Sequence, residues 1–362
     1  MSGDLWAGAE VMAFRLISGL LSEKDVEISA IVLNNQRLAT EIRRSDVPVE
    51  ILDERKLSFF QIKRGLDTLL GKYQPHILHT HRLKENILGY LSSRSFNGKI
   101  SLICTQHGLD EPGSSLKWRI LSKLNSYVLS RHFTYVVAVS EEMRGELAEN
   151  YDSSAKKLVV IHNGTNIGIP HCGRGRDHRF TIGSAGRFFP VKNYCFLVEV
   201  AAEVHRQIKD VRFVLAGEGP ELPKILDKIQ QYRLGETFLL KGFIEDISCF
   251  YNGLDVYINT SLHEGFPMSV LEAMAHGLPI IGPREGGIKE AVVEGENGFL
   301  VEGRSPTRYA EKCVELYRKR GLKEHMAKSS REMVESRFST RTMSKKYLDL
   351  YHKTLSRRCH AE

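Results

Sequence analysis

Two acidic residues in the second half of the chain have the spacing of groups that bind hydroxyls. Glu264 and Glu272 lie eight positions apart in the segment LHEGFPMSVLEAMAHGLPII. Pro267 suits the start of a helix and Gly277 its end, so we expect a helix from Pro267 to His276. Amides at the start of that helix would bind a diphosphate or sugar hydroxyls. They belong to Phe266, Met268 and Ser269.

The two glutamates would act at different depths of one site. Glu264 stands just before the helix, next to Gly265, and Glu272 stands more than one turn into it. Because a carboxylate accepts two hydrogen bonds, Glu272 is suited to the vicinal hydroxyls of a ribose. An arbitrary pair of helical glutamates is more often only solvated. The interpretation of Glu264 and Glu272 as binding residues therefore depends on other motifs of the sequence.

Two cations in another motif support this interpretation. In GSAGRFFPVKN an apolar run ends in glycines, and Arg187 and Lys192 follow in a turn. Such a pair can converge on one diphosphate and stabilise the charge of a leaving group. This chemistry needs no metal and no D-x-D motif, so we expect neither a metal nor another cofactor.

The elements that must position these residues alternate along the whole chain. Apolar runs of strand length recur between helical patterns, which predicts an α/β fold with parallel sheets. In the first half these runs are VEISAIVL, VPVEIL, HILHT, KISLICT, FTYVVAV and KLVVIH. In the second half they are FTIGSAG, VRFVLAG, TFLLKG, DVYIN, LPIIG and GFLV.

A turn-rich stretch from Gly164 to Asp177 separates the two series and reads as a linker. We therefore expect an N-terminal Rossmann-like lobe at 1–168 and a C-terminal lobe at 178–339, with helix 340–362 completing the first lobe. Ligands of such sheets bind beyond the carboxyl ends of the strands, which places the expected site in a cleft between the lobes.

The first lobe opens without its usual first strand. Met1 is followed almost at once by SGDLWAGAEV, which has the character of a glycine-rich turn and the helix after it. A missing strand would leave its neighbour unpaired. A misassigned start codon would explain the same gap.

Composition excludes several classes of protein. No run approaches the ~20 apolar residues of a membrane span, and no signal peptide is visible. The net charge of +7 does not distinguish nucleic acid, anionic lipid and phosphorylated small molecules. The cysteines form no C-x-x-C pair, which argues against a disulfide framework or a zinc ribbon and favours the cytoplasm. They are Cys104, Cys172, Cys195, Cys249, Cys313 and Cys359.

These motifs together resemble glycosyltransferase family 4, a group with the two-lobed GT-B fold. The matching segments are GRFFPVKN, FVLAGEGPE, KGFIEDI, VYINTSLHEGFPMSVLEAMAHGLPIIG, REGGIKEAV and ENGFLV, in the family's order. The resemblance runs from SGDLWAGAEV to the last helix. It implies a retaining transferase that uses a UDP- or GDP-sugar, with a glycan or lipid-linked acceptor in cell-envelope polysaccharide or glycolipid synthesis.

The resemblance also implies roles in the second lobe. Arg187 and Lys192 would bind the donor diphosphate, Glu272 the ribose, and Glu264 would face the transferred sugar. Further donor contacts would come from Gly217 in the loop AGEGPE, from Phe243 and Ile247 near the base, and from the segment Gly265, Phe266, Pro267 and Met268.

In the first lobe the resemblance points to three residues. Gly8 in the Ala7-Gly8 pair would approach phosphate or sugar closely. His107 follows the run KISLICT and matches a histidine that the family keeps near the anomeric carbon. His81 in LHTHRLK would line the acceptor side, although a structural role for it is the commoner outcome.

The acceptor side carries a basic amphipathic segment, LKWRILSKLNSYVL. Its apolar stripe is interleaved with cations, which suits either docking on an anionic membrane or an ordinary core-facing helix. The stripe comprises Ile120, Leu121, Leu124, Tyr127 and Val128, and the cations are Lys117, Arg119 and Lys123. Other basic residues of this lobe would suit the inner face of a membrane: Arg55, Lys56, Lys63, Arg64 and Lys72.

Three other functions compete with transfer. A sugar-nucleotide epimerase of similar fold would bind the same donors without an acceptor. A nucleic-acid-binding protein is disfavoured, because neither an RNP-like aromatic pair nor a zinc module is visible. An impaired transferase would follow from the missing first strand.

Overall fold

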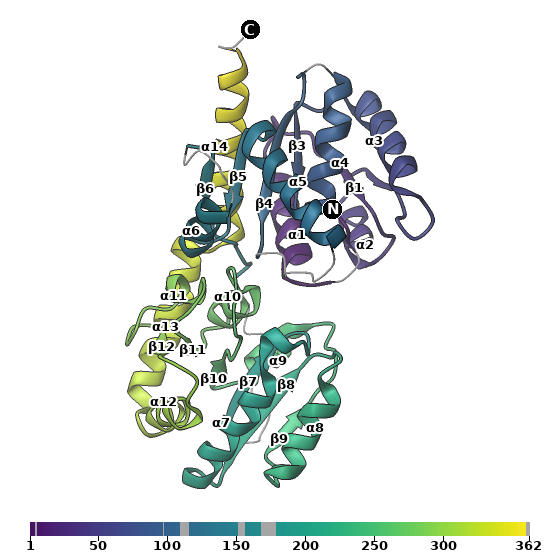
Figure 1. Cartoon of the computed structure of the whole chain (residues 1–362). Coiled ribbons are helices and arrows are strands. Elements are labelled where there is room, and N and C mark those ends of the chain that lie inside the picture. Colours follow the sequence, from purple (N-terminus) through teal and green to yellow (C-terminus); the bar gives the residue numbers. More distant parts are fainter. Residues whose placement is uncertain (4–5, 97, 109–115, 151–155, 168–178, 360–362) are drawn as a thin grey trace. The chain divides into compact units, whose positions relative to one another are not determined.

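The computed structural model describes residues 1–3, 6–96, 98–108, 116–150, 156–167 and 179–359 (Figure 1). The chain forms two compact units: a first lobe of residues 1–164 and 340–362, and a second lobe of residues 165–339. Most of the predicted linker, residues 168–177, lies outside the described part of the chain. The prediction of an α/β chain with parallel sheets is confirmed.

The first lobe contains all six strands predicted for it, in parallel pairs. These are β1 (Ala30–Val32), β2 (Val49–Ile51), β3 (Ile77–Thr80), β4 (Ser101–Gln106), β5 (Tyr135–Ala138) and β6 (Leu158–Val160). Its helical elements are α1 (Gly8–Leu20), α2 (Arg37–Arg43), α3 (Phe59–Tyr73), α4 (Leu83–Ser93), η1 (Arg94–Phe96), α5 (Leu116–His132), α6 (Glu141–Asn150) and α14 (Thr340–Cys359).

The last helix belongs to the first lobe, although its sequence follows the second. Helix α14 packs on α1, where Gly19 makes room for Ser344. A Cβ atom at Gly19 would lie 2.0 Å from the hydroxyl oxygen of Ser344. The close approach of the two helices therefore depends on this glycine.

The sheet of the first lobe is divided. β1 and β2 form a two-stranded sheet, and β3, β4, β5 and β6 form a separate one. Over residues 1–3 and 6–29 no strand is assigned that could join them. Met1 bonds to the end of β1, because its amino group donates to the Ile31 carbonyl (2.8 Å) and its carbonyl accepts from the Leu33 amide (2.9 Å). The division agrees with the predicted lack of a first strand.

The second lobe has one continuous parallel sheet in the order β12-β11-β10-β7-β8-β9. The six predicted strands appear as β7 (Phe180–Ala185), β8 (Val211–Ala216), β9 (Phe238–Leu240), β10 (Val256–Ile258), β11 (Ile280–Pro283) and β12 (Gly298–Val301). The helical elements are η2 (Pro190–Lys192), α7 (Tyr194–Gln207), α8 (Leu222–Gln231), α9 (Ile247–Asn252), α10 (Met268–Ala275), α11 (Ile288–Ala291), α12 (Pro306–Arg318) and α13 (Arg320–Arg337).

The strand order creates a switch point between β7 and β10. The chain moves outward from β7 through β8 to β9, then returns to β10 on the other side of β7. The loops that follow β7 and β10 therefore lie side by side at the carboxyl edge of the sheet, where ligands of such sheets bind. A core of apolar side chains, including Ile182, Val200 and Leu215, fixes this arrangement under α7 and α12.

Two further features concern the cysteines and the search for a membrane-spanning helix. Cys249 is disulfide-bonded, which the scattered cysteines did not predict, whereas Cys104, Cys195 and Cys313 are free. Within the described ranges, no helix combines the length and the apolar character needed to cross a membrane.

Candidate active site

The switch point brings Lys192 and Glu264 together from 72 positions apart. Lys192 ends η2 after β7, and Glu264 lies in the loop after β10. The Lys192 ammonium forms an ion pair with Oε1 of Glu264, and the Ser261 hydroxyl donates to the same oxygen at 2.7 Å. The Lys192 and Glu264 side chains are 20% and 17% exposed, so an entering anion can reach the pair. A diphosphate would have to compete with Glu264 for the ammonium.

The backbone holds this pair in place. The Leu262 amide donates to the Val191 carbonyl at 2.7 Å, and the Thr260 hydroxyl donates to the Lys192 carbonyl at 3.0 Å. The two loops are thus joined by hydrogen bonds beside the charged side chains. Preorganisation of this kind is what a site for a charged ligand requires.

Arg187 provides a second cation in the same loop. Its side chain is exposed, and its guanidinium carbon lies 4.8 Å from the centre of the Phe189 ring. It forms no ion pair with the described residues. A planar guanidinium free of a carboxylate partner is suited to bind phosphate oxygens.

Gly217 has a structural explanation for its residue type. Its φ is +133°, and a Cβ atom would lie 2.0 Å from the Gly186 carbonyl oxygen. Gly219 has φ +156°, and its Cβ would lie 2.6 Å from the Phe188 carbonyl oxygen. Both glycines therefore let the loop after β8 pack directly on the loop that carries Arg187.

Gly286 and Gly287 support the other side of the site, and the sequence analysis did not single them out. The Gly287 amide donates to the Glu264 carbonyl at 2.9 Å. A Cβ atom at Gly287 would lie 1.8 Å from the Gly265 carbonyl oxygen, and one at Gly286 would lie 2.6 Å from the Glu264 carbonyl oxygen. The double glycine in REGGIKEAV was the available signal.

Helix α10 begins one residue after the predicted start, with Pro267 as its N-cap, and ends before His276. Phe266, Pro267 and Met268 are buried, as is Gly265. Glu272 is partly exposed, and its Oε2 accepts a hydrogen bond from the Tyr251 hydroxyl at 3.0 Å.

Two buried tyrosines underlie the charged pair and were not predicted. The Tyr257 hydroxyl donates to the Ala185 carbonyl at 3.2 Å. Burial, aided by the negative charge of Glu264, raises the pKa of Tyr257 to about 12. Burial also raises the pKa of Tyr194 well above its ordinary value. Both tyrosines are therefore neutral hydrogen-bond donors at neutral pH.

Phe243 and Ile247 lie after β9. The Phe243 side chain is exposed, and its amide donates to Oε1 of Glu218 at 3.3 Å. Ile247 is the first residue of α9, which Asp246 caps by accepting from the Ser248 amide at 3.0 Å. This places both residues at the carboxyl edge of the sheet, beside the loop that contains Glu218.

The candidates of the first lobe follow two neighbouring strands. His81 comes after β3 and His107 after β4. Nδ1 of His81 lies 3.1 Å from Nε2 of His107, and their rings are stacked with centroids 5.4 Å apart. Burial and then the charge of Arg82 lower the pKa of His107 to about 4, against a smaller opposing effect of Glu85. His107 is therefore a neutral imidazole at pH 7.

His79 is a third histidine of this cluster, which the sequence analysis missed. Its ring lies between the Tyr351 hydroxyl and the Thr105 hydroxyl, each at 2.8 Å, and stacks on His81. The Tyr347 hydroxyl lies 2.8 Å from the same Thr105 hydroxyl. These bonds tie α14 to β3 and β4. His79 and His81 are two positions apart in HILHTH, so side chains at these positions of a strand lie on the same face. This spacing could have indicated His79 as well as His81.

Gly8 is the exposed first residue of α1. The N-cap, Ala7, has no side chain that could bond to the first amides of the helix. Two positions further on, the buried Glu10 forms an ion pair with Arg82. The start of α1 is thus anchored to Arg82, the residue that follows His81.

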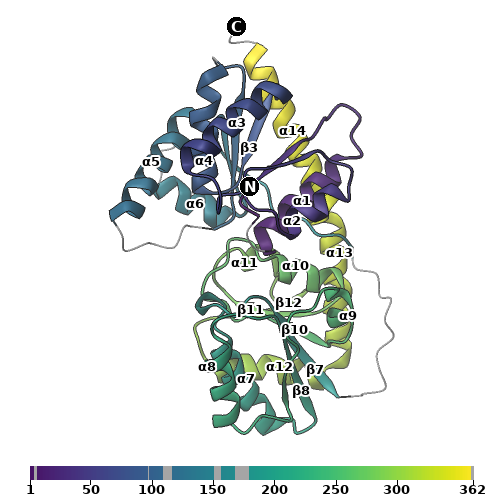
Figure 2. The ribbon, with the colours of Figure 1, turned by 90° about the vertical axis from the view of Figure 1, so that its right-hand side faces the viewer.

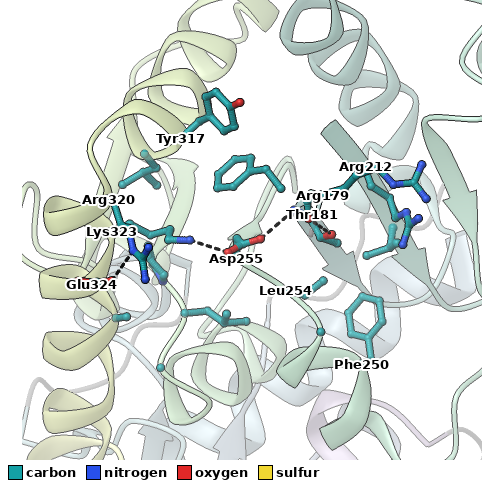
Figure 3. A pocket seen from close by; sticks show the side chains of 18 of the residues that line it. Arg179, Thr181, Arg212, Phe250, Leu254, Asp255, Tyr317, Arg320, Lys323 and Glu324 are labelled. Carbon is teal, nitrogen blue, oxygen red and sulfur yellow. Dashed lines mark hydrogen bonds and ion pairs between the residues drawn. The ribbon is translucent and has the colours of Figure 1, made fainter. Parts of the chain in front are cut away.

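The second lobe also contains a pocket between its sheet and α13 (Figure 3). Arg179, Thr181, Arg212 and Asp255 line it at or beside the amino ends of β7, β8 and β10. The Asp255 carboxylate accepts from the Thr181 amide at 3.0 Å and pairs with Lys323 of α13 at 2.5 Å. None of the predicted site residues lines this pocket, and its acid ties α13 to the sheet.

The described residues contain no group of three or more His, Cys, Asp or Glu side chains arranged to hold a metal ion. Of the predicted candidates, the structure brings together Lys192 with Glu264 and His81 with His107. Gly8, His81 and His107 belong to the first lobe, and the remaining candidates to the second.

Comparisons with known proteins cover both lobes. The family described as Glycosyltransferase Family 4 matches residues 6–168, and the family described as Glycosyl transferases group 1 matches residues 179–319. N-acetyl-alpha-D-glucosaminyl L-malate synthase of Bacillus anthracis is 26% identical over 77% of this chain and 75% of its own length. A UDP-Gal:alpha-D-GlcNAc-diphosphoundecaprenol alpha-1,3-galactosyltransferase of Escherichia coli is 26% identical over 79% and 78%.

Solved structures show the same fold. HepE of Anabaena in complex with UDP-glucose matches with a TM-score of 0.85 over 98% of both chains, at 18% identity. A glycosyltransferase from Rickettsia africae matches with a TM-score of 0.83 over 98% of this chain and 97% of its own, at 21% identity. With both lobes matched in order and the GT-B fold established, the chain belongs to the group 1 glycosyltransferases of family 4.

Proposed function

We propose that this enzyme is a retaining, metal-independent hexosyltransferase that uses a UDP- or GDP-sugar. The acceptor is a glycan or a lipid-linked sugar in cell-envelope polysaccharide or glycolipid synthesis. The observation that carries the proposal is the Lys192–Glu264 ion pair at the switch point, with Arg187 exposed in the same loop. Two cations and one carboxylate match a ligand that joins a diphosphate to a sugar.

Each residue has a role in the proposed donor site. Lys192 and Arg187 bind the diphosphate, and Glu272 binds the ribose while the Tyr251 hydroxyl orients it. Glu264 binds a hydroxyl of the transferred sugar once the diphosphate has displaced it from Lys192. Phe243 and Ile247 border the base, and Gly265, Phe266 and Met268 contribute main-chain amides, whereas Pro267 has none to donate.

The proposed reaction proceeds on one face of the sugar. The bond between the anomeric carbon and the diphosphate oxygen breaks as the acceptor oxygen bonds to the same carbon. The departing diphosphate oxygen takes the proton of the acceptor hydroxyl, and the cations at Arg187 and Lys192 stabilise its negative charge. His107, neutral at pH 7, donates or accepts one hydrogen bond to the sugar but carries no charge into the site.

The relatives support the choice of substrates. The Escherichia coli relative is named for UDP-Gal and a diphosphoundecaprenol-linked acceptor, and solved structures of HepE contain UDP and UDP-glucose. We propose a cytoplasmic location because the donor is a nucleotide sugar.

Equilibrium binding of UDP, GDP and ADP to the purified protein tests the donor site. One diphosphate should bind most tightly, and Lys192→Ala should weaken that binding roughly tenfold or more, because a charge-assisted contact is lost. Lys328→Ala is the matched control, since Lys328 is an exposed lysine of α13 in the same lobe. Single-stranded DNA should not compete.

Turnover separates the remaining alternatives. Release of the diphosphate that depends on an added acceptor indicates transfer, whereas conversion of the donor sugar without acceptor indicates an epimerase. Binding of a diphosphate without any turnover indicates an impaired transferase, as the divided sheet of the first lobe would allow. Activity that survives EDTA supports the metal-independent mechanism, and loss of activity restored by a divalent ion contradicts it.

A further inference from the structure

Helix α5 has one buried face and one apolar face that is exposed. Val128 and Leu129 are in the core, and Asn125 is buried, where its carbonyl accepts from the Asn86 amide group of α4 at 3.0 Å. The opposite face carries Ile120, Leu124 and Tyr127, which are 58%, 40% and 56% exposed. The stripe predicted from the sequence is therefore split between two faces, and Val128 does not belong to the exposed one.

The exposed side chains form one continuous surface. Positions 120, 124 and 127 follow one another by four and three residues, so they line the same side of the helix. The helix lies at the periphery of its lobe, beside α4 (Figure 2). Exposed apolar residues that stand singly need no explanation, but three on one helical face indicate a binding surface.

The solvent-exposed part of α13 shows what an ordinary surface helix of this protein looks like. It carries ion pairs one turn apart between Arg320 and Glu324, between Lys328 and Glu332, and between Arg331 and Glu335. Helix α5 has no such pair. From residue 116 to residue 140 the sequence contains no aspartate or glutamate, and its cations include Arg119, Lys123 and Arg131.

These cations surround the apolar side chains and are not neutralised. Arg119, Lys123 and Arg131 are exposed and form no ion pair with the described residues. Arg94 of η1 and Lys157 add positive charge nearby, because both act with Arg131 on the neighbouring His132. By contrast, three of the basic residues noted in the sequence are paired with acids: Arg55 with Asp53, Lys63 with Asp67, and Lys72 with Glu50.

We propose that this α5 face docks the protein on an anionic lipid bilayer. The face comprises Ile120, Leu124 and Tyr127 with Arg119, Lys123 and Arg131. The apolar side chains enter the boundary between headgroups and acyl chains, and Tyr127 keeps its hydroxyl at the headgroup level. The cations attract anionic headgroups, and this attraction falls off with salt. The inference concerns the surface of the first lobe alone and does not depend on the proposed donor chemistry.

A second copy of the chain fits this face less well. A symmetric dimer through α5 would bring Arg119 and Lys123 of one copy toward the same cations of the other, without acids to neutralise them. Three apolar side chains on one helix also cover far less than the ~800 Å² per partner of a standard protein interface. An extended anionic surface complements the positive charge of the α5 face and does not require a large apolar area.

Vesicle flotation tests the proposal with the full chain. The protein should float with vesicles that contain phosphatidylglycerol, should not float with pure phosphatidylcholine, and should be released by high salt. The double variants Ile120→Ser/Leu124→Ser and Arg119→Gln/Lys123→Gln should each weaken binding roughly tenfold or more. Matched controls in the second lobe are Leu226→Ser, an exposed leucine of α8, and Lys328→Gln.

Several outcomes would overturn the inference. Absence of flotation with anionic vesicles would do so, and so would binding that both double variants retain in full. Circular dichroism and thermal unfolding should match the wild type, as expected for exposed residues. Sedimentation velocity tests whether a second copy of the chain occupies this face instead. If the unmodified chain is a dimer and the Ile120→Ser/Leu124→Ser variant is a monomer, the face serves self-association.

Discussion

The two lobes hold their candidate residues in opposite electrostatic states. In the second lobe Lys192 and Glu264 form an ion pair and Arg187 is exposed. In the first lobe burial keeps His107 neutral by lowering its pKa to about 4, and His79 likewise with a pKa of about 3. Charged groups suit a diphosphate, and neutral donors and acceptors suit hydroxyl groups. The contrast teaches that the second lobe holds its candidate side chains as charged groups, whereas burial keeps the histidines of the first lobe neutral.

Removal of one charge in the second lobe should have the largest effect. Glu264→Gln leaves the Lys192 ammonium without its acid, so bare UDP or GDP should bind more tightly, roughly threefold to tenfold. Turnover should fall about 100-fold, because the contact to the transferred sugar is weakened. Isothermal titration and initial rates measure the two effects. Near-normal turnover would refute the role assigned to Glu264.

Substitution in the first lobe should separate binding from turnover. His107→Asn should lower kcat about tenfold to 100-fold and leave nucleotide diphosphate affinity unchanged, because both cations of the proposed diphosphate site, Arg187 and Lys192, belong to the other lobe. Its low pKa also means that the pH–rate profile of the unmodified enzyme has no limb from His107 between pH 5 and 8. A rate that halves near pH 6.5 and does so no longer in His107→Asn would contradict this.

The buried histidines should make the first lobe sensitive to acid. The pKa of His79 falls from 6.5 to about 3 on folding, mainly through burial, so the unfolded chain binds more protons between those values. Stability is full above pH 6.5 and is lost as pH falls toward 3, by up to about 1.4 kcal/mol per pH unit for this residue. Denaturant unfolding measures the free energy of unfolding at pH 7 and at pH 5. The difference between these two values should be smaller for His79→Gln than for the unmodified protein.

The smallest effect is expected at the proposed ribose contact. Tyr251→Phe removes the hydroxyl that donates to Glu272 at 3.0 Å. One lost hydrogen bond to a charged group corresponds to about 1.5 kcal/mol, or roughly tenfold weaker binding at most. Nucleotide diphosphate titration measures it, and Tyr317→Phe, an exposed tyrosine of α12, serves as the control. A ligand that lacks the ribose hydroxyls should lose this difference.

The sequence by itself determined the α/β class, the twelve strands and, to within one residue, the start of α10. Apolar runs and turn residues are local signals, and each specifies its own element wherever that element packs. The motifs around Glu264 and Lys192 could also be recognised from the sequence, because a family resemblance rests on short continuous segments.

Only the tertiary structure decided which side chains meet and which are exposed. The contact between Lys192 and Glu264 depends on β10 returning beside β7, and the need for Gly287 depends on the approach of the Gly265 carbonyl. His79 gained its importance from Tyr351 on a helix 272 positions away. On α5, periodicity grouped Val128 with Ile120, but packing buried the first and exposed the second. Such outcomes depend on pairs of distant residues, and no local pattern contains them.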